Sequence, residues 1–144
     1  MITSCFATAI KYKTMYSFSS HINHDFSSAI NIVTEALGEK GFGILTEIDV
    51  QATLKKKLNI DKNPYTILGA CNPGFANRAL DSEPEIGVLL PCNVVVTETS
   101  PGKSTVIFMD PEAVLNLTEN PDVKTIVAEV RQLLEEVKDI IENK

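Results

Sequence analysis

The chain has 144 residues, 44% hydrophobic and 22% charged, a balance typical of one globular domain and not of a disordered segment. Its 19 acidic and 13 basic side chains give a formal net charge of −6, which disfavours binding to the phosphates of nucleic acids. No apolar run is long enough to span a bilayer, and three widely spaced cysteines fit a reducing compartment. We therefore expect a cytoplasmic protein with neither a nucleic-acid nor a membrane partner.

The start of the chain differs from the rest in its pattern. Residues 1–15 show no hydrophobic period, and Met15 stands where the pattern sharpens. We therefore expect a weakly ordered N-terminal extension over residues 1–15 and a single domain over residues 16–144.

The first half of the domain alternates strands with helices. A strand is predicted over residues 16–22, and a helix follows the N-cap Asp25 and ends at Gly41. The next strand is predicted over residues 42–48, and Asp49 is expected to cap a short helix after it. Period-two alternation would place four residues of this strand on one face: Phe42, Ile44, Thr46 and Ile48.

The middle of the domain contains a third predicted strand and a helix. The strand covers residues 65–70, and Asn72 followed by Pro73 is typical of an N-cap and first helical position, so a helix is expected over residues 73–81. Pro84 and Gly87 end this helical segment.

The last third of the domain contains a hairpin and the longest amphipathic segment. Strands are predicted over residues 92–99 and 104–109, joined by a turn at residues 100–103. Asp110 opens a short helix that reaches Leu117. Asn120 opens the last helix, whose apolar residues follow a three-four spacing, so one of its faces must be buried: Val123, Ile126, Val127, Val130, Leu133, Leu134, Val137, Ile140 and Ile141.

These elements predict an α+β fold. Because the chain finishes its sheet with a tight hairpin, we expect two layers, a largely antiparallel twisted sheet with helices packed on one face. A fully parallel, doubly wound sheet is the alternative. It is disfavoured by the hairpin and by the absence of a glycine-rich turn between a strand and a helix.

Three stretches of the sequence resemble a known family. They are GFGILTEIDV at residues 41–50, ILGACNP at residues 67–73 and LLPCNVVV at residues 89–96. In this order they are similar to the family named domain of unknown function 302, and the resemblance covers the chain from about Tyr16 onward. It implies a compact domain with helices over an antiparallel sheet, commonly seen as a dimer, and it implies no established activity.

The two cysteines in these stretches are the first candidates for chemistry. Cys71 ends a strand just before a helix N-terminus, which can lower the pKa of a thiol, and Cys92 begins a strand after Pro91. Antiparallel pairing of the two strands would place both sulfurs at one end of the sheet. The two thiols are therefore candidate catalytic residues, whereas the alternative interpretation makes them small buried hydrophobic residues.

Five polar residues are candidates for ligand binding. Asn72 and Asn93 each follow a cysteine and can donate and accept hydrogen bonds. Glu47 and Asp49 are a possible acid–base pair at a strand end, and Arg78 on the following helix can pair with such a carboxylate or bind an anionic ligand.

No metal or cofactor site is expected. His21 and His24 have ligand-like spacing beside Asp25, but further ligands would have to come from elsewhere in the chain. The sequence contains no phosphate loop, zinc signature or nucleophile elbow. The expected function is therefore a homodimeric binding or interaction module, with a small-molecule ligand or a protein as partner. The alternative is a thiol-dependent protein for sulfur transfer, redox chemistry or soft-metal binding that uses Cys71 and Cys92.

Overall fold

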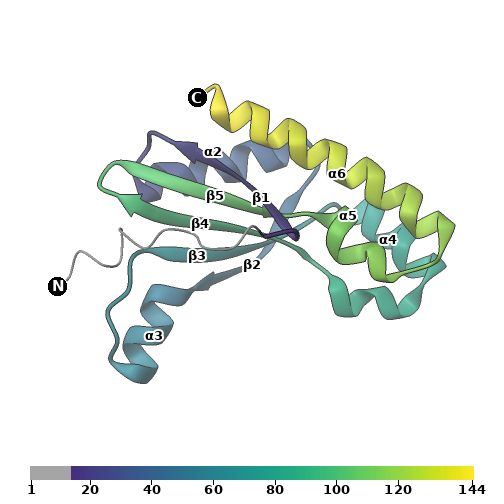
Figure 1. The fold of residues 1–144 in the computed structure, drawn as a ribbon, viewed down its shortest axis with the longest axis horizontal. Coiled ribbons are helices and arrows are strands. Elements are labelled where there is room, and N and C mark those ends of the chain that lie inside the picture. Colours follow the sequence, from purple (N-terminus) through teal and green to yellow (C-terminus); the bar gives the residue numbers. More distant parts are fainter. Residues whose placement is uncertain (1–13) are drawn as a thin grey trace.

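The structure is a computed structural model and describes residues 14–144. In this part of the chain five strands form one sheet in the order β1-β5-β4-β3-β2 (Figure 1). The strands are β1 (Ser17–Ile22), β2 (Gly43–Asp49), β3 (Tyr65–Cys71), β4 (Cys92–Ser100) and β5 (Lys103–Met109). Every neighbouring pair is antiparallel, which confirms the predicted α+β fold and excludes the parallel alternative. The predicted N-terminal extension lies outside the described residues except for Thr14 and Met15.

Two long helices cover one face of the sheet. They are α2 (Phe26–Glu39) and α6 (Pro121–Glu142), which contact each other and the strands below them (Figure 1). The other helices are α3 (Val50–Leu58), α4 (Pro73–Ser82), η1 (Pro84–Leu89), α5 (Pro111–Val114) and η2 (Leu115–Leu117). Figure 1 shows α3 projecting away from the rest of the molecule, whereas α4, η1 and α5 gather at the opposite end. Within residues 14–144, no helix combines the length and the apolarity needed to cross a lipid bilayer.

The helix starts follow the predicted caps. Three of the predicted capping side chains accept a hydrogen bond from a backbone N–H in the first turn of their helix. The distances are 2.8 Å for Asp25, 2.9 Å for Asp49 and 3.0 Å for Asn120. Asn72 and Asp110 cap α4 and α5 in the same way. After α2, the N–H of Phe42 reaches back to the carbonyl of Leu37 at 2.9 Å, and Gly41 has a φ of 85°, a conformation in which glycine has no steric penalty.

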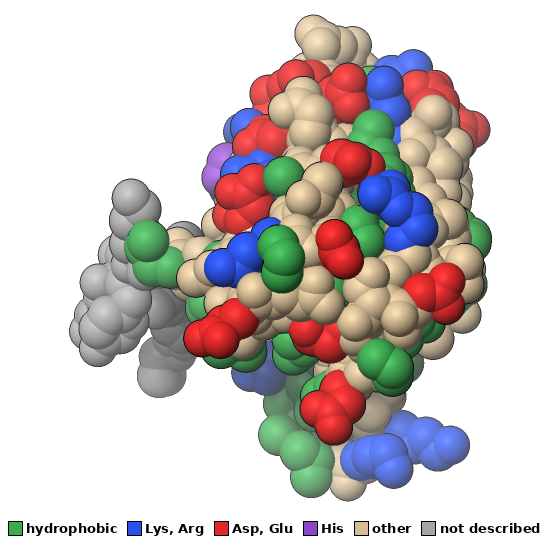
Figure 2. Space-filling view, turned by 90° about the vertical axis from the view of Figure 1, so that its right-hand side faces the viewer, with side chains coloured by type: hydrophobic (Ala, Val, Ile, Leu, Met, Phe, Trp, Pro, Cys, Tyr) green, Lys and Arg blue, Asp and Glu red, His purple; other side chains and the backbone are tan. Residues whose placement is uncertain are grey.

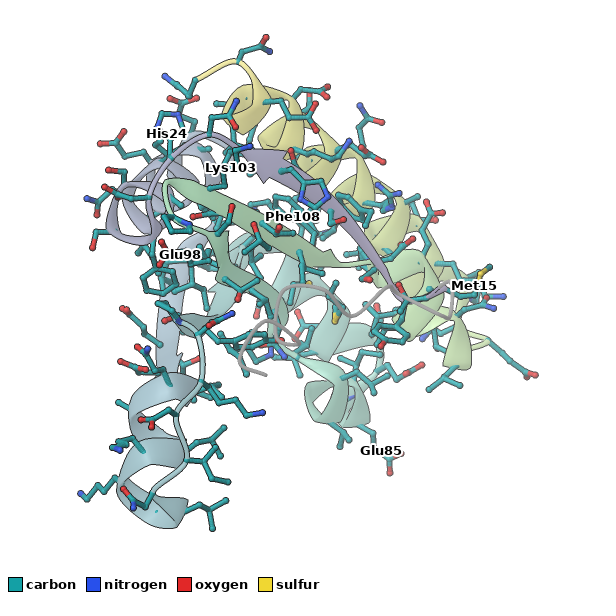
Figure 3. All side chains as sticks on the ribbon, turned by 60° about the vertical axis from the view of Figure 1, so that its left-hand side comes forward. Met15, His24, Glu85, Glu98, Lys103 and Phe108 are labelled. Atoms are coloured by element: carbon teal, nitrogen blue, oxygen red, sulfur yellow. The ribbon has the colours of Figure 1, made fainter. Side chains whose placement is uncertain are left out.

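The core lies between the sheet and the two long helices. Leu68, Val94 and Phe108 are register partners on three adjacent strands, and all three are fully buried. Phe108 lies near the middle of the sheet (Figure 3), and its ring stacks on that of Phe18 in β1 with a centroid distance of 5.1 Å. The apolar side of α6 closes this core through seven buried residues, which confirms the predicted stripe.

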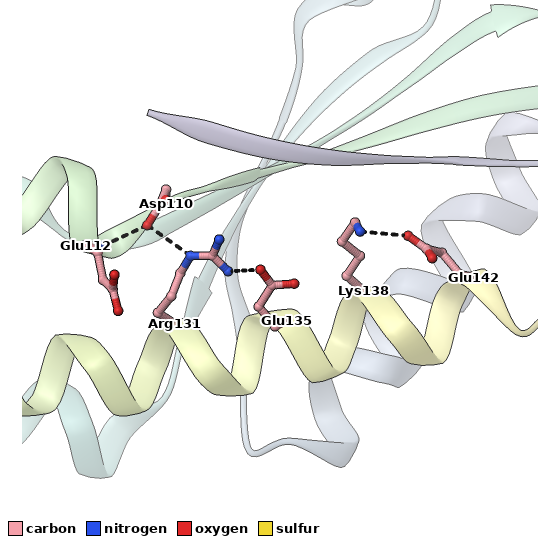
Figure 4. Close-up of polar contacts among 6 residues, drawn as sticks. All are labelled: Asp110, Glu112, Arg131, Glu135, Lys138 and Glu142. Atoms are coloured by element: carbon pink, nitrogen blue, oxygen red, sulfur yellow. Dashed lines mark hydrogen bonds and ion pairs between the residues drawn. The ribbon is translucent and has the colours of Figure 1, made fainter. Parts of the chain in front are cut away.

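Arg131 joins α6 to the strands at the edge of the core. Its guanidinium lies 4.0 Å above the centroid of the Phe18 ring, and its Nε lies 3.1 Å from the carboxylate of Asp110. It also pairs with Glu135 one turn later in α6 (Figure 4). Because Asp110 in turn accepts the N–H of Glu112 at 2.9 Å, one arginine fixes α6 against β1 and against the start of α5.

The predicted alternation in β2 is wrong beyond Ile44. The register passes from Ile44 opposite Ala70 directly to Thr46 opposite Gly69, so Leu45 is an extra, bulged residue. The bulge moves Thr46 and Ile48 to the face opposite Ile44, and it moves Glu47 to the same face as Ile44. A Cβ at Gly69 would collide with the hydroxyl of Thr46, so the absence of a side chain at Gly69 permits this register.

We expect truncation of the α6 stripe to destabilise the whole domain. Leu134 is completely buried, so Leu134→Ala should lower the free energy of unfolding by about 2–5 kcal/mol through lost burial and a residual cavity. Gln132, exposed on the same helix, is the matched control, and Gln132→Ala should leave the free energy of unfolding nearly unchanged. Equal losses in urea denaturation for both variants would contradict this packing.

Candidate ligand-binding cavity

An apolar cavity of about 290 Å³ lies at one end of the sheet, under α4 and η1. The strand ends of β3 and β4 form one wall, and α6 forms another. Most of its lining is aliphatic or aromatic, and the polar side chains in it are those of Cys71, Asn72 and Cys92. Representative lining residues from the three helical elements are Phe75, Ala76, Ala79, Ile86, Val127 and Val130.

Both cysteines lie at the end of the sheet that forms this wall. β3 and β4 are antiparallel neighbours with Ala70 opposite Cys92, so Cys71 and Cys92 lie at the same end of the sheet, as predicted. Both thiols are free, and both line the cavity. Pro91, which enters β4 through a cis peptide bond, approaches Gly69 closely enough that a Cβ there would lie 3.0 Å from its Cγ.

The helix start does not lower the pKa of the Cys71 thiol. Burial raises the pKa of Cys71 above its usual value, although the N-terminus of α4 follows directly. Burial, with a smaller contribution from the charge of Cys71, raises the pKa of Cys92 to about 11. Both are therefore protonated at neutral pH and are weak nucleophiles.

Asn72 lines the cavity but has a structural role as well. Its Oδ1 accepts the N–H of Phe75 at 3.5 Å, and its Nδ2 donates to the carbonyl of Lys40 at 3.4 Å. The same amide nitrogen lies close to Gly41, where a Cβ would come within 3.0 Å of it. Asn72 thus ties the start of α4 to the end of α2, beside the cavity.

Arg78 stands next to the cavity without lining it. Its guanidinium lies 5.5 Å from the centroid of the Phe75 ring, and Phe75 belongs to the lining. Its Nη1 pairs with Glu129 of α6 at 3.3 Å, so this arginine already has a carboxylate partner. It joins the outer surface of α4 to α6.

Three predicted ligand-binding residues lie away from the cavity. Glu47 and Asp49 are exposed near the far end of β2 from Gly43, the register partner of Cys71, and Asp49 caps α3. Asn93 is exposed on the sheet face that carries no α2 or α6, opposite Gly69. The structure therefore groups only Cys71, Asn72 and Cys92 of the seven candidates.

The histidine pair is also remote from the cavity. Nδ1 of His21 lies 2.9 Å from the hydroxyl of Thr105 on β5, and His24 lies beyond the end of β1 (Figure 3). Among residues 14–144, no three or more His, Cys, Asp or Glu side chains form a group that could hold a metal ion.

The sequence did not reveal the cavity itself. Its other walls come from Ala76 and Ala79 in α4, from η1 and from the first turns of α6. The only feature of the sequence that pointed to a cavity was the pair of small residues at helical spacing in α4. The same pair is equally compatible with close packing of this helix.

Comparisons with known proteins identify relatives without an assigned activity. A family model described as "Domain of unknown function DUF302" matches residues 18–141. A solved structure described as "Crystal structure of uncharacterized conserved protein DUF302 from Bacillus stearothermophilus" is 27% identical, with a TM-score of 0.81. The match covers 89% of this chain and 99% of that chain. The comparison with curated proteins gave no match.

We expect the two thiols to react slowly and unequally with iodoacetamide. Cys71 is half-buried, whereas Cys92 is 7% exposed, so Cys71 should be alkylated first. Because the thiolate is the reactive form and both pKa values are raised, the rates at pH 7 should be far below that of a free thiol and should still rise above pH 9. Peptide mass spectrometry across pH 7–10 measures each site, and a rate for Cys71 that levels off below pH 8 would show an activated thiol instead.

Proposed function

The chain belongs to the DUF302 family, whose description states no activity, and we propose that it is a non-catalytic binding module whose apolar cavity holds a small, neutral, hydrophobic molecule. The cavity is the observation that carries this proposal. At about 290 Å³ it stands at the lower end of the range for ligand pockets, and its lining is mostly aliphatic and aromatic, as in such pockets.

The size and lining of the cavity support a small apolar occupant. A void lined by apolar side chains gives water too few hydrogen-bond partners, whereas it receives apolar molecules readily. Leu45 and Leu80, which also line the cavity, are 65% and 40% exposed, so the apolar lining continues to the surface at a mouth between β2 and α4.

The charges around the cavity support a neutral ligand. No charged side chain is among the lining residues, and Arg78 beside it is paired with Glu129. The chain carries a net charge of −6. Figure 2 faces the end of the molecule where α4, η1 and α5 lie, and it shows acidic side chains spread among apolar and basic ones. An anionic ligand would be repelled by the net charge of the chain and would lose its hydration inside the apolar cavity.

A thiol-dependent function is the second candidate. It is favoured by one observation, that Cys71 and Cys92 line the same cavity. Sulfur transfer and redox chemistry through a nucleophilic thiol need a thiolate near neutral pH, and burial opposes this at both positions. Soft-metal binding has no such requirement, because the metal itself displaces the protons. The two free thiols also support the reducing cytoplasm as the location of the protein.

We propose in addition that the protein is a homodimer, formed through the face of the sheet opposite α2 and α6. On this face the register aligns Ile48, Ile67, Val95 and Ile107 in one row across four strands. Ile48 is 49% exposed and the other three are half-buried. An apolar row of this kind supports packing against a second sheet, and a two-fold axis would bring the same row of a second copy onto it.

We expect small neutral hydrophobic molecules to bind in the cavity. Indole and hexanol should raise the melting temperature by several degrees at high concentration, because a ligand present at 100 times its Kd stabilises the fold by about 2.7 kcal/mol. Benzoate, an anion of similar size, should have little effect. Differential scanning calorimetry measures the shifts.

A cavity-filling variant provides the control for this experiment. Ala76 lines the cavity, so Ala76→Leu should reduce the shifts, whereas Ala113→Leu on the exposed surface of α5 should not. Equal shifts in both variants, or no shift with any neutral probe, would refute the cavity as a binding site.

We expect a lysine in the apolar row to separate the dimer. Wild-type protein should have the mass of two chains in light scattering at micromolar concentration, and Ile107→Lys should have the mass of one, because it places a charge in the interface. Thr34→Lys on the exposed side of α2 should remain dimeric. A wild-type monomer, or a dimeric Ile107→Lys variant, would exclude this interface.

A further inference from the structure

We propose that α3 and the turn after it form a basic arm that docks on the acidic end of a second copy of the chain. The basic arm comprises residues 49–62. The acidic end comprises residues 73–89 and 110–122, which contain α4, η1, α5 and η2. This contact rests on the proposed homodimer and orients its two copies.

The strands place the basic arm and the acidic end at opposite ends of the molecule. β2 runs from Gly43, the register partner of Cys71, to Asp49, which caps α3. The basic arm therefore joins β2 to β3 at one end of the sheet, whereas α4 follows β3 at the other end. α5 follows β5 at the same end as α4, because Phe108 lies opposite Val94, close to the start of β4.

The two segments have opposite charge. The basic arm contains four lysines and two aspartates, a formal charge of +2, whereas the acidic end contains seven acidic side chains and one arginine, a formal charge of −6. Lys55 pairs with Asp61 inside the arm. Within residues 14–144 the other three lysines of the arm form no ion pair. Figure 2 shows basic side chains on the part that projects below the acidic end. These charges favour contact of an arm with an acidic end over contact between two like segments.

Both segments also expose large apolar side chains to water. Leu58 and Ile60 are exposed at the tip of the basic arm, on either side of the turn that ends α3. Leu80, Val88 and Leu117 are exposed on the acidic end. Contact between the two segments removes these side chains from water, which is favourable, while the charges around them give the contact its direction.

α3 receives little packing from its own chain. It has nine residues, and none of them is buried. In water a helix shorter than about 12–15 residues is only marginally stable unless another surface packs against it. A second copy supplies that surface, and this need for packing favours a protein partner for the arm.

One two-fold axis accommodates both the basic arm and the apolar row of the proposed interface. The row lies on the sheet face opposite α6, and α3 projects on the side of the strands away from α6 (Figure 1 and Figure 3). An axis parallel to the sheet and perpendicular to its strands lays one row against the other and reverses the ends of the strands. Each basic arm then lies beside the acidic end of the other copy, so the two contacts are identical and the dimer is closed.

Charge reversal followed by mixing tests this contact. The arm variant carries Lys56→Glu and Lys57→Glu, which change the charge of the basic arm to −2. The end variant carries four lysines in place of exposed acidic residues, which change the charge of the acidic end to +2: Asp81→Lys, Glu85→Lys, Glu112→Lys and Glu119→Lys. In sedimentation equilibrium each variant alone should dimerise about tenfold or more weakly than wild type, because like charges meet at both contacts.

Mixing the two variants separates a lost contact from a damaged fold. In a mixed dimer each arm again faces an end of opposite charge, so an equimolar mixture should have the mass of two chains at a concentration where each variant alone is a monomer. A variant carrying Lys124→Glu and Lys144→Glu, both exposed outside the arm, changes the net charge as much as the arm variant does and should dimerise like wild type.

Cross-linking in the wild-type protein covers variants that fail to fold. A carbodiimide applied to mixed isotope-labelled and unlabelled chains should join lysines of one basic arm to carboxylates of the other copy's acidic end. A wild-type dimer that survives reversal of the arm, a mixture no stronger than either variant, or the absence of these cross-links would overturn the arm contact and leave the homodimer in place. A wild-type monomer would refute the homodimer itself. Binding of the wild type to anionic lipid vesicles that is lost in a still dimeric arm variant would assign the arm to a membrane surface instead.

Discussion

The antiparallel pairing of β3 with β4 is the constraint on which the rest of this structure depends. Because the two strands pair with Ala70 opposite Cys92, the chain between them must leave and re-enter the sheet at the same end. That connection contains α4 and η1, and it folds back over the strand ends instead of crossing the sheet. The cavity, the position of both cysteines at one end of the sheet and the helix start beside Cys71 are all consequences of this one pairing.

The position of α6 determines that a space remains under α4 and η1. α6 is fixed to the sheet by its buried stripe and by Arg131, which contacts Phe18 and Asp110. The end of α4, where it joins η1, is held by hydrogen bonds in front of α6: the hydroxyl of Thr118 donates to Glu83 at 2.5 Å, and Asn120 donates to the carbonyl of Ser82 at 3.1 Å. With both ends of α4 held in place, the small side chains on its inner surface leave the volume unfilled.

Local features of the sequence were sufficient for the elements but not for the site. The N-caps from Asp25 to Asn120 were predictable because a cap depends on residues within one turn. The sheet face on which each β2 side chain lies was not predictable, because the bulge at Leu45 depends on Gly69 of another strand. The direction of the pKa shift of Cys71 could not be predicted, for the same reason. The helix start beside it is visible in the sequence, whereas the surface that buries it comes from elements distant in the chain. The cavity was the least predictable feature, because its volume depends on the packing of α4 and η1 against α6 and the sheet.

The apolar environment of the cavity governs which ligands suit it. Removing water raises the free energy of any isolated charge, and for this reason both thiols remain protonated and a nucleophilic mechanism is disfavoured. A neutral hydrophobic molecule avoids this penalty because it brings no charge. Burial therefore disfavours Cys71 and Cys92 as nucleophiles, and the same apolar surroundings suit the neutral hydrophobic ligand that we propose for the cavity.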